Sequence, residues 1–240
     1  MYSLEFNIIL MLFIGYLFGS IPVGYLYCKA HGVNIFEVGS GNPGSTNVGR
    51  VLGKTHGRVV FVLDILKTMI PILIAHFVII RLNYSRNGIG FTSAFIKHLS
   101  LNLQVLHKGS FRDPFVIFTT GIGAILGHNF PFPTHFRGGK GIACTVAVVA
   151  YFNVIFAVIL FVIHKLIGKL TGYVSLASIL TLIIMFLTSL IMSINKVYPF
   201  NFDYSYAVLP EIFIIMILGI FRHKENIDRL EKGTENKIKR

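Results

Sequence analysis

Apolar runs of about 20 residues recur along this chain, and they restrict its fold more than any other feature. The clearest are Asn7 to Tyr27, Val59 to Ile80 and Val174 to Ile194. Because a helix needs roughly 20 apolar residues to cross the hydrocarbon core of a bilayer, each run predicts a transmembrane helix. Hydrophobic residues make up 54% of the 240 residues and charged residues only 13%, which excludes a soluble domain. We therefore expect an all-α, polytopic membrane protein that forms a single domain over residues 1–240.

The other apolar runs set the number of crossings. Residues 114–126 form a short run, residues 142–166 a long one with Asn153 inside it, and residues 206–221 the last. The basic tail over residues 222–240 is expected in the cytoplasm, where Lys and Arg are retained, and the N-terminus outside. This topology requires residues 142–166 to split near Asn153, which gives seven transmembrane helices with the fourth unusually short. The basic, polar connection over residues 83–112 would then lie outside, against the charge rule.

The basic balance of the chain fits a membrane surface better than a nucleic acid. There are 22 Lys and Arg against 10 Asp and Glu, a net charge of +12, but the basic residues fall mostly in loops and in the tail. There they attract anionic lipid head groups, so we expect membrane lipids and no nucleic acid as partners. Cys28 and Cys144 border different apolar segments and are expected to stay reduced.

Some ionisable residues lie within or beside apolar sequence. Asp64 and Lys67 are spaced i,i+3 on one helix face, which predicts a mutual ion pair that offsets the cost of burying either charge. His128 and His135 are interpreted as loop hydrogen-bonding residues, because a zinc or iron site needs closer ligands with carboxylate or cysteine partners. No metal and no cofactor are expected.

Three polar regions interrupt the apolar sequence, and the most distinctive is Phe136-Arg137-Gly138-Gly139-Lys140-Gly141. Glycines let the backbone approach an anion closely, and a helix starting at Ile142 would direct its positive end at the same place. Alone, the stretch fits either a phosphate cradle or a ligand-free membrane loop. The second region, Val38 to Arg50, is rich in hydroxyls, amides and glycines. The third, His223 to Glu235, is typical of a basic helix beside the membrane, with His223 and Asn226 on one face.

Taken together with Gly19 to Gly24 and Gly127-His128-Asn129-Phe130-Pro131, these regions resemble the bacterial acyl-phosphate:glycerol-3-phosphate acyltransferase family, called PlsY. The resemblance covers nearly the whole chain in the same order. It implies seven transmembrane helices in the bacterial inner membrane, with the motif loops clustered at the cytoplasmic face. It also implies transfer of a fatty acyl group from acyl phosphate to the 1-hydroxyl of glycerol 3-phosphate. The products would be lysophosphatidic acid and inorganic phosphate, in the first acylation step of phospholipid biosynthesis, with no required protein partner.

The same resemblance implies the site residues, and their chemistry suits two phosphate-bearing substrates. Lys140 and Arg50 supply charge for phosphate, and an acyl phosphate needs no covalent enzyme intermediate. His223 and Asn226 are expected on glycerol 3-phosphate, with either His223 or a donor phosphate oxygen as the base. The expected catalytic residues are Ser40, Arg50, Lys140, His223 and Asn226. The expected substrate-binding residues are Asn42, Thr46, Asn47, Gly138, Gly139, Gly141, Ser175 and Ser178, and Glu235 is expected to hold the tail structurally.

The chain departs from the family pattern at three places. Residues 83–112 are longer than the corresponding connection, Arg137 replaces a common lysine, and Ser45 replaces a common alanine. Arginine keeps the charge but presents a planar fork, which changes phosphate geometry.

Two other functions fit the sequence less well than the acyltransferase. A membrane transporter of a phosphorylated metabolite would also use glycines and cations, but its site should lie near the bilayer midplane, and the sequence has no internal repeat. A metal-dependent phosphatidyltransferase is disfavoured because clustered aspartates are missing.

Overall fold

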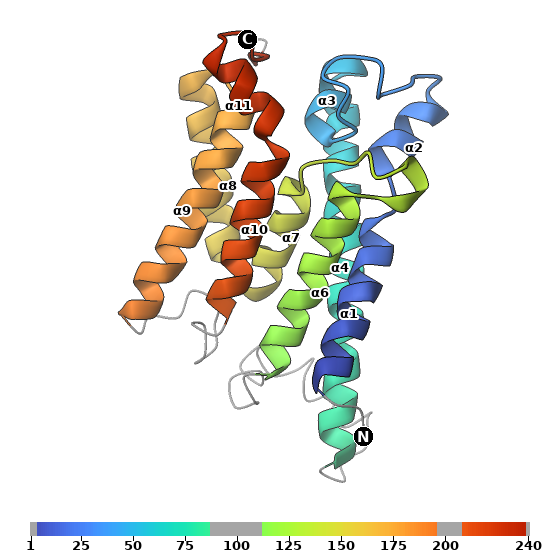
Figure 1. Ribbon diagram of the computed structural model, residues 1–240, viewed down its shortest axis with the longest axis vertical. Coiled ribbons are helices and arrows are strands. Elements are labelled where there is room, and N and C mark those ends of the chain that lie inside the picture. The colour runs from blue at the N-terminus through green and yellow to red at the C-terminus, as the bar shows by residue number, and fades with distance from the viewer. Residues whose placement is uncertain (1–3, 87–111, 196–207, 239–240) are drawn as a thin grey trace.

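The computed structural model describes residues 4–86, 112–195 and 208–238, and all regular structure in these ranges is helical. The helices form an elongated bundle (Figure 1). Their bounds are α1 Leu4–Gly19, α2 Val23–Ala30, α3 Ser45–Val51, α4 Lys54–Arg86, α6 Arg112–Asn129, η2 Phe132–Thr134, α7 Ile142–Phe152, α8 Val154–Thr171, α9 Val174–Ile194, α10 Leu209–Arg222 and α11 Lys224–Glu231. The all-α prediction is confirmed for these ranges. Most of the 83–112 connection lies outside the described residues.

Five segments of the described chain are long and apolar enough to cross a membrane. They are Glu5–Ala30, Lys54–Val78, Pro114–Thr134, Val154–Thr171 and Val174–Ile194. Two further apolar helices are shorter, with 11 residues in α7 and 14 in α10. Large apolar side chains cover the outside of the bundle, as Ile155 and Leu170 of α8 illustrate at 74% and 75% exposure. Such a surface suits lipid, so the protein is a multi-pass membrane protein.

One prediction about helix continuity was confirmed and one was wrong. Asn153 does divide its apolar run: its backbone is extended, and its side-chain oxygen accepts a hydrogen bond from the Phe156 amide at 2.9 Å, which caps α8. The first span, however, is not one continuous helix. The α-helical pattern stops after Gly19 and restarts at Val23, because Pro22 cannot donate a backbone hydrogen bond.

Glycines allow α1 and α6 to pack backbone against backbone. A methyl group added at Gly15 would lie 2.1 Å from the Thr120 carbonyl oxygen, and one at Gly19 would lie 2.1 Å from that of Ala124. On the opposite helix, Gly127 has the same relation to the Tyr16 carbonyl oxygen at 2.2 Å. Small residues spaced by four are the usual means of close helix packing in membranes. This contact fixes the end of α6, from which the glycine-rich stretch continues.

The predicted ion pair is present in the core, with Lys67 Nζ 2.9 Å from Asp64 Oδ1. The interpretation of His128 as a loop residue was wrong, because α6 continues to Asn129 and His128 Nδ1 lies 3.4 Å from the same Asp64 oxygen. His135 does lie outside the long helices and is exposed. Cys28 and Cys144 are buried and free, as predicted.

Candidate functional site

The three polar regions come together at one end of the bundle, where α3, α11 and the segment before α7 lie (Figure 1). Long-range hydrogen bonds connect them. Asn42 donates to the Gly138 carbonyl at 3.5 Å, and Arg50 donates to the Asn236 carbonyl at 3.5 Å. Arg222 donates to the carbonyls of both Gly138 and Gly139, at 2.9 and 3.0 Å. These bonds hold the glycine-rich stretch between the 38–50 region and the C-terminal helices.

The glycine-rich stretch needs its glycines because its backbone lies directly on other backbone and on a ring. A methyl group at Gly138 would lie 2.3 Å from the His128 carbonyl oxygen, and one at Gly139 would lie 2.0 Å from His128 Nε2. Gly141 has a φ of +79° at the start of α7, a left-handed conformation that favours glycine. The backbone between Gly138 and Gly141 is therefore constrained, and this restricts the position of Lys140.

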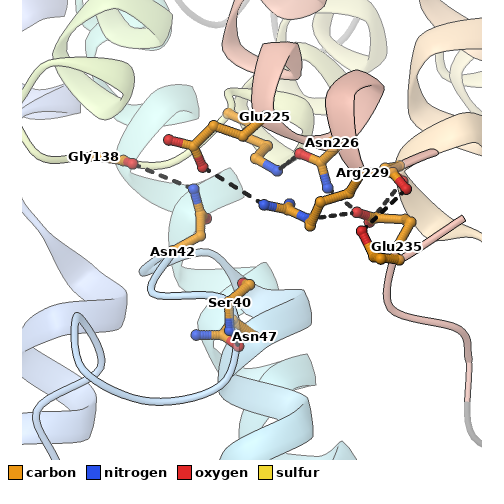
Figure 2. A network of polar contacts seen from close by, with 11 residues as sticks. Ser40, Asn42, Asn47, Gly138, Glu225, Asn226, Arg229 and Glu235 are labelled. Atoms are coloured by element: carbon orange, nitrogen blue, oxygen red, sulfur yellow. Dashed lines mark hydrogen bonds and ion pairs between the residues drawn. The ribbon is translucent and has the colours of Figure 1, made fainter. Parts of the chain in front are cut away.

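Lys140 starts a chain of polar contacts that runs into the tail. Its ammonium donates to the side-chain oxygen of Asn226, and Asn226 in turn donates to Glu235 at 2.7 Å. The same carboxylate accepts from Arg229 at 2.8 Å and from Ser175 at 2.9 Å (Figure 2). Asn226 and Glu235 are buried, so these hydrogen bonds satisfy polar groups that have no access to water. Glu235 thus ties the tail to α9 and α11, as the sequence predicted.

The charges of this cluster do not balance. Lys140, Arg50, Arg222 and Arg229 are grouped around Glu225 and Glu235, an excess of two positive charges. Burial, followed by the charge of Arg229, lowers the pKa of Lys140 to about 8. Burial alone would raise the pKa of Glu235, but hydrogen bonds from Arg229, Asn226 and Ser175 hold it below the usual value. A dianionic phosphate would neutralise the excess.

Apart from Arg50, the 38–50 region faces this cluster with neutral groups (Figure 2). Asn47 is buried and shapes the loop, because its side chain accepts from the Ser40 amide at 2.8 Å and donates to the Val38 carbonyl at 3.0 Å. The oxygen of Asn42 accepts from the Gly44 amide at 2.9 Å. Ser40 is half-buried, and Thr46 is exposed at the start of α3.

His223 is buried at the junction between α10 and α11. Its Nδ1 lies 2.7 Å from the Gly219 carbonyl oxygen, which only accepts hydrogen bonds, so Nδ1 carries the proton. Burial, with the charge of Lys140, lowers the pKa of His223 to about 4. The ring is therefore neutral at pH 7 and offers Nε2 as a hydrogen-bond acceptor.

Lys140 contacts Asn226, and Ser175 joins the same network through Glu235, whereas Ser178 makes its contacts elsewhere. Ser178 lies 3.2 Å from Nε2 of His164 and donates to the Val174 carbonyl.

Sequence reasoning did not assign Arg222 and Arg229 to the site, although both lie on α-helical positions near Asn226. Their spacing of four and three residues from Asn226 was the available signal. Within the described residues, no group of three His, Cys, Asp or Glu side chains could hold a metal ion.

These features define a class of protein: a multi-pass helical membrane protein whose glycine-rich, cationic site lies at one end of its bundle. Residues 9–233 match the sequence profile of the family described as glycerol-3-phosphate acyltransferase. A glycerol-3-phosphate acyltransferase from Aquifex aeolicus is 36% identical over 223 residues, which are 93% of this chain and 95% of the relative. One from Legionella pneumophila is 32% identical over 232 residues, 96% of this chain and 69% of the relative.

The chain therefore belongs to the glycerol-3-phosphate acyltransferase family, and it is an acyltransferase of phospholipid synthesis. Two solved structures are similar to it: crystal structures of PlsY (YgiH), an integral membrane glycerol 3-phosphate acyltransferase. The glycerol 3-phosphate form has a TM-score of 0.71 and 35% identity and covers 97% of this chain and 96% of its own. The lysophosphatidic acid form has a TM-score of 0.69 and 34% identity, with coverage of 97% and 95%. The predicted family is confirmed, and the transporter and phosphatidyltransferase alternatives lose their support.

Proposed function

We propose that this enzyme transfers a fatty acyl group from acyl phosphate to the 1-hydroxyl of glycerol 3-phosphate. The products are 1-acyl-glycerol 3-phosphate and inorganic phosphate. Its relatives are named glycerol-3-phosphate acyltransferases, and similar structures are described as glycerol 3-phosphate and lysophosphatidic acid forms. The acyl phosphate donor is what the resemblance to the PlsY family implies, and Lys140 and Arg50 support it because each offers a cation for one phosphate.

The observation that carries the proposal is the Lys140–Asn226 pair, with its surrounding excess of positive charge. An ammonium beside an amide offers a phosphate monoester one charged and one neutral donor. His223 lies three residues from Asn226, on the same side of the junction, and its Nε2 suits a substrate hydroxyl as acceptor. We therefore assign glycerol 3-phosphate to Lys140, Asn226 and His223.

The 38–50 region is assigned to the acyl donor. Ser40 and Asn42 supply neutral donors, and Arg50 supplies a fork for the donor phosphate. Gly138, Gly139 and Gly141 let the backbone close around the anions, and Thr46 and Asn47 complete the loop. Ser175 acts through Glu235, which it contacts at 2.9 Å. Ser178 is retained as a substrate-binding proposal through its place on α9.

In the proposed reaction the 1-hydroxyl oxygen of glycerol 3-phosphate attacks the acyl carbonyl carbon. A new C–O ester bond forms, and the bond between that carbon and the phosphate oxygen breaks, so phosphate leaves with the electron pair. The hydroxyl proton passes to a phosphate oxygen of the donor or to Nε2 of His223. A His223 pKa of about 4 makes the ring a weak base, which favours a positioning role and leaves the phosphate as acceptor.

The proposed topology has seven transmembrane helices in the bacterial inner membrane, with α7 as the short fourth helix. The five long apolar segments, with α7 and α10, supply that number. The N-terminus is assigned to the outside, and the site and the C-terminus to the cytoplasm, because basic residues follow α2 and α10. No cofactor and no protein partner enter the proposal.

An assay of the purified protein in lipid bilayers tests the donor. With acyl phosphate and glycerol 3-phosphate, we expect lysophosphatidic acid and inorganic phosphate in equal amounts. With acyl-CoA in place of acyl phosphate, we expect neither product above the background without enzyme. Product formation from acyl-CoA but not from acyl phosphate would overturn the donor assignment.

A further inference from the structure

A buried ionic cluster lies beneath the glycine-rich stretch, and the proposed reaction makes no direct use of it. It consists of Asp64 and Lys67 of α4 and His128 of α6, and we call it the Asp64 cluster. Asp64 Oδ1 lies 2.9 Å from Lys67 Nζ and 3.4 Å from His128 Nδ1. The side chains are 2%, 6% and 8% exposed, so all three are removed from water.

One member of the cluster supports the glycine-rich stretch directly. The His128 carbonyl accepts a hydrogen bond from the Gly139 amide at 2.9 Å. The His128 ring lies against the same glycine, since a methyl group there would be 2.0 Å from Nε2. Asp64 Oδ1 faces the other ring nitrogen, Nδ1, at 3.4 Å, so the ring lies between this carboxylate and Gly139. Lys140 is the next residue in the chain.

Another member reaches the start of the 38–50 side of the site. Lys67 Nζ donates to the Ile21 carbonyl at 2.8 Å, in the break between α1 and α2. The following helix packs against the 38–50 region so closely that a methyl group at Gly24 would lie 1.8 Å from the Pro43 carbonyl oxygen. The Asp64 cluster is thus a common support for two walls of the site.

Stability alone is a poor explanation for this cluster. A buried ion pair pays a desolvation cost that often equals its Coulomb attraction, and well-packed apolar residues are frequently as stable. Within the described contacts, its members meet the site through the backbone of Gly138 and Gly139 and not through the side chains assigned to substrate. What distinguishes the cluster is its location, directly under the backbone that carries Lys140.

We propose that Asp64 and His128 are positioning residues for Lys140. Asp64 orients the His128 ring, and the ring determines the position of Gly139. The position of Gly139 in turn determines the direction of the Lys140 ammonium. This inference rests on the proposed binding of glycerol 3-phosphate by Lys140. Loss of this support lets the glycine-rich stretch move, and a displacement of about 1 Å lowers the reaction rate by up to on the order of 100-fold. The loss therefore affects the binding of glycerol 3-phosphate and not the stability of the fold.

Steady-state kinetics of the bilayer-reconstituted enzyme test the proposal through four variants. His128→Ala removes the ring, and His128→Asn keeps an N–H donor near the position of Nδ1. Asp64→Asn/Lys67→Met removes both charges together, so neither is left buried and unpaired. Glu211→Gln is the matched control, because Glu211 is also a buried carboxyl and accepts a hydrogen bond from Thr119 at 2.6 Å. Glu211 lies in the first turn of α10, at the end of that helix remote from His223.

We expect His128→Ala and Asp64→Asn/Lys67→Met to raise the KM for glycerol 3-phosphate by about tenfold or more, with the KM for the acyl donor changed less than about threefold. His128→Asn should recover most of the loss, and Glu211→Gln should leave both KM values at those of the wild type. Equal loss for both substrates, no recovery in His128→Asn, or wild-type KM values in folded His128→Ala would overturn the proposal. A wild-type KM in Lys140→Ala would instead refute the proposed site itself.

Discussion

Lys140 and Asn226 are separated by 86 positions in the chain, yet the lysine ammonium donates a hydrogen bond to the side-chain oxygen of Asn226. The Asn226 nitrogen donates to Glu235 at 2.7 Å. Because an ammonium only donates and a carboxylate only accepts, these partners fix the orientation of the amide. Asn226 therefore joins Lys140, which we assign to glycerol 3-phosphate, to the carboxylate that anchors the tail.

Replacement of Asn226 tests its contacts with Lys140 and with Glu235. We expect Asn226→Ala to lower kcat/KM for glycerol 3-phosphate by on the order of 100-fold, because Lys140 loses its partner and the substrate loses a donor. Asn226→Asp should be at least as impaired, since it places a second carboxylate beside Glu235. The measurement is steady-state kinetics in bilayers with the melting temperature recorded in parallel. Wild-type kinetics in either variant would contradict the assignment of Asn226.

The activity should fall on the alkaline side with the titration of Lys140. Its pKa of about 8 means that raising the pH above 8 removes the ammonium charge that binds phosphate. We expect kcat/KM for glycerol 3-phosphate to drop about tenfold for each pH unit above that value. Lys140→Arg keeps its charge in this range, so its residual activity should show no such limb. A wild-type profile that stays flat up to pH 10 would rule out a role for this ammonium.

The backbone of the glycine-rich stretch should not tolerate a side chain. In Gly139→Ala the new methyl group would meet His128 Nε2 at 2.0 Å, so either the stretch or the ring must move. We expect a loss of kcat/KM on the order of 100-fold for glycerol 3-phosphate. Gly168→Ala on α8 is the matched control, because its methyl group would have ordinary contacts at 3.6 and 3.7 Å. The prediction fails if the two variants are equally active.

Glu235 should contribute mainly to the stability of the tail and less to the chemical step. Glu235→Gln weakens hydrogen bonds from Ser175, Asn226 and Arg229 and leaves a cation without its buried partner. We expect the free energy of unfolding to fall by about 1–3 kcal/mol and amide exchange of residues 224–238 to quicken. Glu225→Gln is the comparison, since Glu225 is 83% exposed and 3.8 Å from Arg229, and its loss should cost less than about 1 kcal/mol. Equal destabilisation by both variants would show that burial of Glu235 contributes nothing.

The sequence predicted the parts of this structure that follow from local pattern. Apolar runs located most of the helices, Asn153 marked the cap between α7 and α8, and the spacing of Asp64 and Lys67 gave their ion pair. His128 was misplaced because Gly127, Asn129 and Pro131 together are typical of a loop. Gly127 is instead required by the close approach of α1, and the helix continues past it.

The contacts within the site depend on tertiary packing and could not be derived from local pattern. The resemblance identified Lys140 and Asn226, but it did not show that one donates to the other. Arg222 was missed as a support for Gly138 and Gly139 because those carbonyls lie 84 and 83 positions away. Only the folded chain brings these partners together.

We propose that Lys140 binds the phosphate of glycerol 3-phosphate, and substitution of this residue is the sharpest test. The measurement is kcat/KM for glycerol 3-phosphate in bilayers, at pH 7 and with saturating acyl phosphate, for the wild type, Lys140→Ala and Lys54→Ala. Lys54 is an exposed lysine at the start of α4 and serves as the control. We expect a loss on the order of 100-fold in Lys140→Ala, an unchanged melting temperature, and wild-type kinetics in Lys54→Ala. A folded Lys140→Ala enzyme with the kcat/KM of the wild type would contradict it.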